Sequence, residues 1–88
     1  MKFTITYAPY FVRAVKKLSV ALQVEVKEKT ELFSDSKNHE QLKTHALHGK
    51  MKGLHSFAVN YRTRVIVRII RDQCEVYVLD VGDHSIYG

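Results

Sequence analysis

The 88-residue sequence contains only one cysteine, Cys74, and this scarcity excludes several kinds of protein. A single thiol cannot form an internal disulfide, and it cannot build a zinc cluster of cysteines. A lone thiol in a small domain fits a reducing compartment, and we expect Cys74 to be a small buried hydrophobe within a strand. The sequence also lacks an apolar run of signal-peptide length and the ~18 apolar residues that cross a bilayer. We therefore expect a cytoplasmic protein without membrane contact.

Several common catalytic motifs are missing as well. There is no Walker loop, no GxSxG nucleophile elbow, no HExxH pair and no Cys/His spacing for zinc. These absences exclude a P-loop nucleotidase, a serine hydrolase and a zinc protease, because each chemistry needs those residues at those spacings. What remains is histidine together with cations, so we expect neither a metal nor another cofactor.

The apolar residues that are present suffice for one folded domain. Hydrophobic residues make up 45% of the chain, which can offset the ordering entropy that keeps polar chains disordered. At this length about 60–65% of the unfolded surface becomes buried, so the core is modest and a second domain is not expected. We expect a single domain spanning residues 1–88.

Acidic residues are absent from the middle of the chain, where positive charge collects. The formal net charge is +5, and no Asp or Glu occurs between Gln41 and Arg71. The cations in and at the end of this stretch are Lys43, Lys50, Lys52, Arg62, Arg64, Arg68 and Arg71, and the histidines are His45, His48 and His55. Such a segment attracts phosphates and releases counterions when they bind, so it predicts a nucleic-acid contact.

Hydrophobic periodicity predicts a strand followed by two helices in the first part of the chain. Residues 2–7 alternate between apolar and polar, as in a half-buried strand. Pro9 presets the first turn of a helix whose apolar residues recur at helical spacing. Ser19 offers an N-cap for a second helix that ends near Phe33. Residues 40–48 are expected to form either a helical turn or a loop.

The second half of the chain changes to a period of two. From His55 to Ile70 one parity is apolar and includes Tyr61, which we expect mainly to pack in the core. The other parity predicts a cationic face and carries Ser56, Asn60, Arg62, Arg64 and Arg68. Asn60 tolerates left-handed backbone, so the run is expected to fold back there as a hairpin.

A turn at Asp72-Gln73 and a last strand from Cys74 to Val81 complete the pattern. The predicted fold is α+β, with an N-terminal strand, two helices and then a three-stranded antiparallel meander. We expect a single sheet with the helices on one face.

Histidine and positive charge together provide the chemistry of metal-free RNA cleavage. Attack by a ribose 2′-hydroxyl needs a base, an acid for the leaving 5′-oxygen, and positive charge near the phosphorane. An imidazole can act as either acid or base near neutral pH. The candidate acids and bases are His45, His48, His55 and His84. The candidate cations are Lys50, Lys52, Arg62, Arg64 and Arg68, and Tyr61 or Tyr87 could stack on bases.

Some of these residues have an equally good structural interpretation. Tyr87 could pin the tail to the sheet, and Lys50 and Lys52 could protect a sheet edge from pairing. His48 lies in a polar segment, where a histidine is more often a surface residue. These alternatives remain open at the level of sequence.

Two segments of the sequence resemble the RelE/ParE toxin superfamily. Residues 45–53 read H-x-L-x-G-x-x-K-G and residues 82–87 read G-x-H-x-x-Y. With residues 56–65 and the predicted order of elements, the resemblance covers essentially the whole chain. It implies one RelE-like toxin domain of the microbial RNase fold, ribosome-dependent mRNA cleavage in the A site, and inhibition by a cognate antitoxin. The expected complex is a hetero-oligomer with the antitoxin, and the free toxin is expected to be a monomer.

The resemblance also implies roles for individual residues. The implied catalytic set is His45 and His84 from the YafQ-like branch, Arg64 with the adjacent Arg62 from the RelE-like branch, and the terminal aromatic Tyr87. The residues expected to contact RNA are Lys50, Lys52, His55, His48 and Arg68. The sequence mixes the two branches, because Ala58 stands where YafQ-like members carry a histidine and His55 where RelE-like members use a lysine. The division of acid and base roles among the histidines is therefore open.

Two other functions are compatible with the same resemblance. A ParE-type toxin inhibits DNA gyrase by contact and needs no catalytic histidine, and an inactive module of this fold could bind only RNA or an acidic partner. The pairing of His45 with His84 favours the nuclease. That prediction requires the two imidazoles to converge beside Arg64, and an Arg64 turned into the interior would contradict it.

Overall fold

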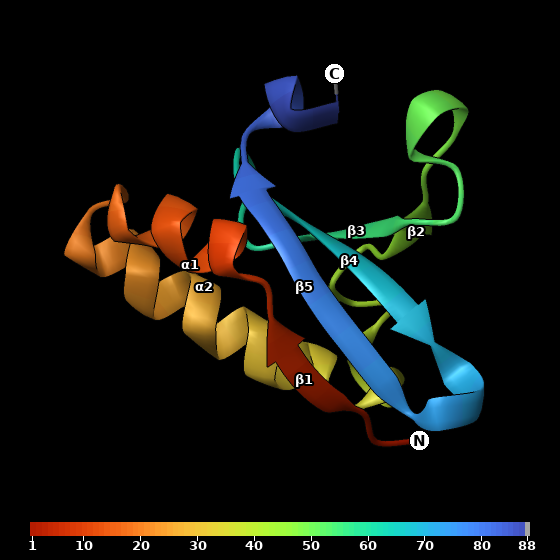
Figure 1. Ribbon diagram of the computed structural model, residues 1–88. Coiled ribbons are helices and arrows are strands. Elements are labelled where there is room, and N and C mark those ends of the chain that lie inside the picture. Colours follow the sequence, from red (N-terminus) through yellow and green to blue (C-terminus); the bar gives the residue numbers. More distant parts are fainter. Residues whose placement is uncertain (88) are drawn as a thin grey trace.

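The computed structural model describes residues 1–87, except for the side chain of His84, and shows one sheet with helices against one face (Figure 1). The strands are β1 (Thr4–Tyr7), β2 (His45–Ala46), β3 (His55–Ala58), β4 (Arg64–Ile70) and β5 (Glu75–Gly82), and the helices are α1 (Pro9–Lys16) and α2 (Val20–Phe33). Short 3₁₀ turns are η1 (Ser36–Asn38), η2 (Gly49–Met51), η3 (Arg71–Gln73) and η4 (His84–Tyr87). The predicted order of a strand, two helices and a three-stranded meander is confirmed.

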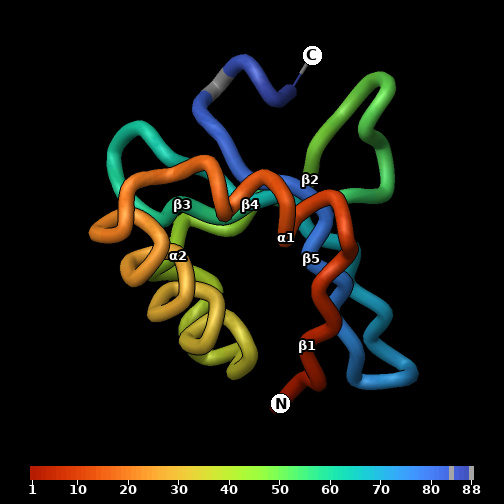
Figure 2. Tube along the Cα trace, turned by 60° about the vertical axis from the view of Figure 1, so that its left-hand side comes forward, coloured from red at the N-terminus to blue at the C-terminus, as the bar shows by residue number. Residues whose placement is uncertain are grey.

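The described strands form a five-stranded mixed sheet in the order β1-β5-β4-β3-β2. β1 lies parallel to β5, with Thr4 opposite Glu75, whereas the other neighbouring pairs are antiparallel. Figure 2 shows the same arrangement from another side, with the red N-terminal strand beside the blue C-terminal one. The sequence predicted the meander β3-β4-β5 but not β2, whose two residues lie in the segment expected to be a helical turn or a loop.

Both helices begin at the residues that predicted their starts. Pro9 is the first residue of α1, where its missing N–H costs no helical hydrogen bond. Ser19 is the N-cap of α2, and its hydroxyl accepts a hydrogen bond from the Leu22 amide at 3.2 Å. Within the part of the chain that the structure describes, neither helix combines the length and apolar character needed to cross a membrane.

The helices and one face of the sheet enclose the core. Phe11 of α1 and Val26 and Phe33 of α2 are buried. The Phe33 ring stacks on Phe57 of β3, with 4.5 Å between the ring centroids. The sheet contributes the buried residues Val65, Val67, Val76 and Val78. Full burial of a Phe or Val side chain stabilises by about 1.5–3 kcal/mol, so this face carries most of the apolar stabilisation.

The opposite side of the sheet, here called the open face, is less cationic than the sequence predicted. Arg64 is half-buried and Arg68 is exposed, but Ser56 and Ile66, on the same side, are 0% and 2% exposed. Ser56 lies opposite Ile66 in the β3-β4 pairing. A bulge next to Ile66 shifts the register of β4 against β5. The open face therefore has a small buried centre with an arginine toward each end of β4.

Three side chains lie where the sequence did not predict them. The run from His55 to Ile70 folds back across residues 59–63 as predicted, but Tyr61 is 90% exposed there instead of packing in the core. Arg62 lies in the same loop rather than on a strand. Cys74 is exposed and precedes β5, with φ of +52°, because a left-handed residue ends the turn η3. The alternation of a strand does not predict the direction of side chains in the turns that follow it.

Candidate functional site

A row of hydrogen-bonded side chains crosses the open face. His45 of β2 lies opposite Ser56 of β3, and its Nε2 is 3.4 Å from the Ser56 Oγ. The same Oγ is 2.9 Å from the hydroxyl oxygen of Tyr87 in η4. This His45–Ser56–Tyr87 row joins the middle of the chain to its C-terminal turn.

The hydrogen bonds of His45 determine which ring nitrogen is available to accept a proton. Its Nδ1 lies 3.2 Å from the carbonyl oxygen of Lys43. Because a carbonyl can only accept, Nδ1 carries the hydrogen of the neutral ring, and Nε2 keeps its lone pair on the side of Ser56. The His45 side chain is exposed, so a substrate hydroxyl can reach it. A neutral imidazole in this orientation can act as a general base.

The glycine-flanked segment after His45 has a clear structural purpose. Leu47 is buried, and its amide donates to the carbonyl of Leu54 at 2.9 Å, which closes the connection between β2 and β3. Gly49 and Gly53 have φ values of +65° and +94°, a region that favours glycine. The H-x-L-x-G-x-x-K-G spacing thus combines a displayed histidine, a core anchor and two turn residues.

The tail returns to the sheet because Gly82 leaves room for it. A Cβ at Gly82 would run into the side chain of Ile86. The turn is also held locally, because the Asp83 carboxylate accepts from the amide and the hydroxyl of Ser85 at 2.9 and 2.6 Å. In this position the Tyr87 hydroxyl is part of the row, which agrees with the interpretation that it pins the tail.

The side chain of His84 lies outside the described residues. The backbone of η4, which includes His84, belongs to the tail that carries Tyr87 back to Ser56. The expected meeting of the His45 and His84 side chains therefore stays a prediction.

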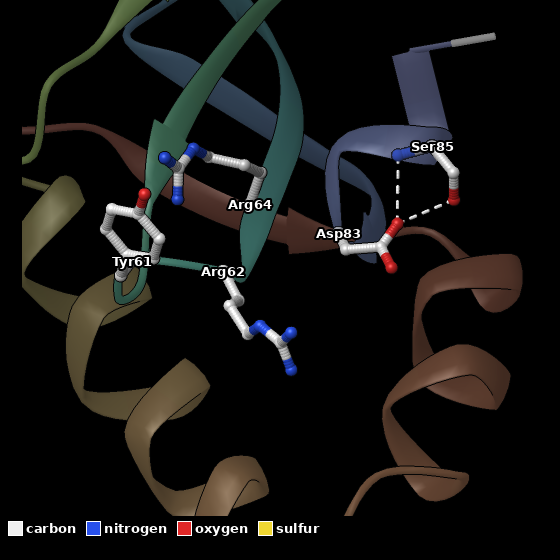
Figure 3. Close-up of a pocket in the computed structure, with 5 residues that line it drawn as sticks. All are labelled: Tyr61, Arg62, Arg64, Asp83 and Ser85. Atoms are coloured by element: carbon white, nitrogen blue, oxygen red, sulfur yellow. Dashed lines mark hydrogen bonds between the residues drawn. The ribbon is translucent and has the colours of Figure 1, made fainter.

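A groove of about 590 Å³ lies between the loop of residues 59–63 and the tail, and Arg64 stands on its wall. Figure 3 shows its lining residues, which are Tyr61, Arg62, Arg64, Asp83 and Ser85. The Arg64 Nη1 donates to the carbonyls of Asn60 and Thr63 at 2.5 and 3.2 Å. The guanidinium is thus held at the groove and is not turned into the interior. We call this the arginine groove.

The strand register sets how far the arginine groove is from the row. His45 pairs with Ser56, which pairs with Ile66, and Arg64 is two residues farther along β4. Two strand spacings of ~4.8 Å and two residues of ~3.3 Å place the Cα atoms of His45 and Arg64 roughly 12 Å apart. Both side chains are long enough to approach one phosphodiester from opposite sides.

The residues predicted to contact RNA divide into two groups. Lys52, His55 and Arg68 line a second groove of about 730 Å³, which also includes Arg71. Lys50 and His48 are instead exposed in the connection between β2 and β3. The structure therefore gathers three of the five predicted residues beside a further arginine.

Burial lowers the pKa of two other histidines, His55 and His39. Desolvation lowers the pKa of His55, and the charges of Arg71, His39 and His45 act in the same direction. Its Nδ1 is buried and has no hydrogen-bond partner among the described residues. The ring of His39 stacks on Phe33 with 3.9 Å between centroids, and desolvation lowers its pKa as well. Both rings favour the neutral form.

The described residues contain no group of three or more His, Cys, Asp or Glu side chains placed to hold a metal ion. His45, with the hydrogen bonds and the positive charge around it, can perform proton transfer.

Two residues of this region were not singled out by sequence reasoning. Ser56 was predicted only as a member of the polar parity, and a buried serine that links two other side chains has no sequence signature. Asn60 was predicted as a turn residue, but its contacts with Arg64 and with the remainder of the loop depend on the folded chain.

No family model and no curated protein sequence matches this chain. Solved structures do resemble it. A chain of the toxin-antitoxin complex RelBE2 from Mycobacterium tuberculosis has a TM-score of 0.75 at 21% identity, covering 96% of this chain and 100% of that chain. A chain of the E. coli DinJ-YafQ toxin-antitoxin complex has a TM-score of 0.75 at 18% identity, covering 98% and 97%. The YoeB/ParE toxin from Agrobacterium tumefaciens has a TM-score of 0.65 at 14% identity, covering 96% and 99%.

These similarities extend over nearly the full length of every chain compared, so they take in the strand, the two helices and the meander of this chain. The chain therefore has the fold of the RelE/ParE toxin superfamily.

Proposed function

We propose that this protein is the toxin of a RelE/YafQ-type toxin-antitoxin system and that it inhibits translation by cutting mRNA on the ribosome. The observation that carries the proposal is the His45–Ser56–Tyr87 row, with the guanidinium of Arg64 held in the arginine groove on the same face of the sheet, two residues along β4 from the partner of Ser56. Two solved structures with this fold are toxin-antitoxin complexes, which supports the toxin assignment. The proposed site of action is the cytoplasm.

Cleavage begins with proton transfer from the ribose 2′-hydroxyl to Nε2 of His45. The 2′-oxygen attacks the adjacent phosphorus, and a pentacoordinate phosphorane forms. The bond to the 5′-oxygen then breaks, and that oxygen takes a proton from an acid, which leaves a 2′,3′-cyclic phosphate and a 5′-hydroxyl. General acid and base groups contribute typically about 10²- to 10⁴-fold each to such a reaction.

His84 is the proposed partner of His45 in this proton transfer, and the two could exchange acid and base roles. The proposal for His84 rests on its place in the G-x-H-x-x-Y segment. Tyr87 orients the row through its hydrogen bond to Ser56. Its ring is also proposed to contact a base beside the scissile phosphate.

Positive charge on the phosphorane is assigned to Arg64 and Arg62. Both line the arginine groove, and a guanidinium offers paired N–H donors to phosphate oxygens. Lys50, Lys52, His48, His55 and Arg68 are proposed to contact RNA farther from the scissile bond. The antitoxin is proposed to cover this cationic surface with an acidic or amphipathic segment, so the complex should weaken as salt rises.

The decisive experiment compares His45→Ala and His84→Ala with the control Tyr10→Ala. Like His45, Tyr10 is exposed, but it lies on α1, away from the row and from both cationic grooves. Growth arrest on induction and mRNA cleavage in a translating extract are the two measurements. We expect both to fall by about 10²-fold or more in His45→Ala and His84→Ala and to change little in Tyr10→Ala.

Antitoxin binding and thermal unfolding should be unchanged in all three variants. Growth arrest that persists without mRNA cleavage would replace the nuclease with gyrase inhibition, the activity of ParE-type toxins of this fold. Absence of any growth effect from the parent protein would leave an RNA-binding module and overturn the toxin proposal.

A further inference from the structure

The side chain of Tyr61 is the most exposed large hydrophobic residue among those described, at 90%. It stands at the tip of the loop of residues 59–63, on the wall of the arginine groove (Figure 3). Exposing a whole aromatic ring forgoes about 1.5–3 kcal/mol of burial. A frayed loop would give the same exposure, but this loop is held in place by hydrogen bonds.

The loop is tied down on both sides of Tyr61. The Asn60 Oδ1 accepts from the amides of Arg62 and Thr63 at 2.9 and 2.8 Å, and the Val59 amide donates to the Thr63 carbonyl at 2.9 Å. These bonds enclose the tyrosine between two fixed residues. Its ring is therefore presented to solvent by a built turn.

Helix α2 supports the same turn from beneath. The Asn60 Nδ2 donates to the Glu25 Oε1 at 2.7 Å, in a partly buried setting. The carbonyl of Asn60 accepts from the Arg64 guanidinium. One asparagine thus fixes the loop, the helix and the arginine with respect to each other.

The residues of the arginine groove match the chemical groups of a nucleotide. An exposed aromatic ring offers a stacking platform for any base, and a nearby guanidinium can hold its phosphate. The bonds of Arg64 to the loop backbone are made by Nη1, whereas a guanidinium carries five N–H donors in all. Arg62 adds a second positive charge at the same groove.

The register places this groove one step from the proposed cleavage site. Arg64 pairs with Ala58, which is two residues from Ser56 on β3. Two residues of strand span about 6.6 Å, close to the distance between adjacent nucleotides of an extended single strand. A chain with its scissile phosphate at the row would therefore put a neighbouring nucleotide at Tyr61.

We propose that the arginine groove is a nucleotide subsite, in which the base of the nucleotide next to the scissile bond stacks on Tyr61, while Arg64 and Arg62 hold the phosphate that joins this nucleotide to the one at the row. Asn60 is a positioning residue of this subsite, because it sets both the ring and the guanidinium. The inference rests on the proposed function for its substrate class. Its test is a binding measurement that needs no cleavage.

The probe is a fluorescent tetranucleotide of 2′-O-methyl RNA, which lacks the attacking hydroxyl and cannot be cut. Binding is measured by anisotropy in the full chain carrying His45→Ala, with Tyr61→Ala and Tyr61→Phe added. We expect Tyr61→Ala to weaken binding roughly 5- to 150-fold, the range for losing one stacked base, and Tyr61→Phe to bind nearly as tightly as the parent. Tyr10→Ala, at a tyrosine of α1 that is 60% exposed, is the matched control and should bind like the parent.

Two further readouts separate stacking from a general loss of charge. The ring protons of Tyr61 should shift upfield in NMR spectra when the probe binds, and Asn60→Ala should reduce both this shift and the affinity. The slope of log affinity against log salt concentration counts the counterions released on binding. Arg62→Gln should reduce this slope by about one, while Tyr61→Ala should leave it unchanged.

Equal affinity of the Tyr61→Ala variant and its parent would overturn the subsite, as would an equal loss in Tyr10→Ala. These outcomes differ from failure of the proposed function. A protein that binds the probe through Tyr61 but never cuts mRNA keeps the subsite and loses the nuclease. A protein that cuts mRNA with unchanged efficiency after Tyr61→Ala keeps the nuclease and loses the subsite.

Discussion

On the helix side of the sheet, aromatic and aliphatic side chains stack into a continuous core, whereas the open face buries little more than Ser56 and Ile66 at its centre. The two faces use the same strands and alternate residue by residue. The covered face draws its stability from apolar area, and a local change there is felt by the whole domain. The open face is held by a few hydrogen bonds between distant segments, so it can carry reactive groups without supporting the fold.

This difference predicts that damage to the covered face is global. Phe57→Ala removes a fully buried ring that stacks on Phe33, and such truncations cost about 3–5 kcal/mol. A domain of this size has a total stability of roughly 4–13 kcal/mol, so the variant should be largely unfolded or close to it. Urea unfolding followed by circular dichroism measures the loss. A loss below about 1 kcal/mol would show that the Phe33–Phe57 stack contributes little, and the exposed-site control Tyr10→Ala should stay within ~0.5 kcal/mol.

A change on the open face should instead separate activity from folding. Gly82→Ala places a methyl group against Ile86 and should push η4 away, at a cost of about 1–3 kcal/mol. The Tyr87 hydroxyl then moves away from Ser56. We expect mRNA cleavage to fall at least about tenfold, because the row loses a contact that orients its proton-transfer group. Cleavage assays and the NMR signals of the Tyr87 ring give the two readouts.

The matched control for this variant removes the obstructing side chain. Gly82→Ala combined with Ile86→Ala frees the space that the new methyl group needs, so the tail should return and cleavage should largely recover. Full activity of the single Gly82→Ala variant would show that the position of the tail does not matter for function.

The smallest of the three effects is a pH dependence that belongs to the covered face. Desolvation lowers the pKa of His39 and outweighs the hydrogen bond between its Nε2 and the Phe33 carbonyl, which raises the pKa. Desolvation also lowers the pKa of His55. The unfolded chain therefore binds more protons than the folded one. Stability from these rings is complete above pH ~6.5 and is lost as pH falls from there through the lower folded pKa values.

We expect the urea midpoint to fall between pH 7.5 and pH 5.5, and to fall less in His39→Phe, which keeps a ring between its aromatic neighbours but cannot be protonated. Asp35 has a lowered pKa and so affects stability only below about pH 4, outside this window. Val20→Ala, which changes an exposed residue that does not titrate, serves as the comparison and should leave the slope as in the parent. An identical slope in His39→Phe would show that this histidine does not set the acid sensitivity.

The elements that a regular pattern encodes were predictable from the sequence. Pro9 and Ser19 mark the helix starts because their effects are local, and the valines of β4 and β5 define the core through strand alternation. The hairpin at Asn60 followed from the same local reasoning. Tyr61 and Cys74 were misplaced because alternation was extended into turns, where backbone geometry decides the direction of a side chain.

The candidate site was predictable in its composition but not in its connections. The motif residues His45 and Tyr87 were identified from sequence, and Ser56 between them was not. Their contact depends on the two-residue strand β2, on the space above Gly82 and on the pairing of distant strands. None of these is a property of a short window of sequence.

The parallel pairing of β1 with β5 has a consequence for the timing of folding. Thr4 is made early and Glu75 late, yet they face each other in the finished sheet. Pairing across so much intervening chain is slow to form because the loop must be closed first. While β5 and η4 are still inside the ribosome that makes the chain, β1 has no partner strand and the tail is not folded back, so the surface that carries the row assembles only after these residues emerge.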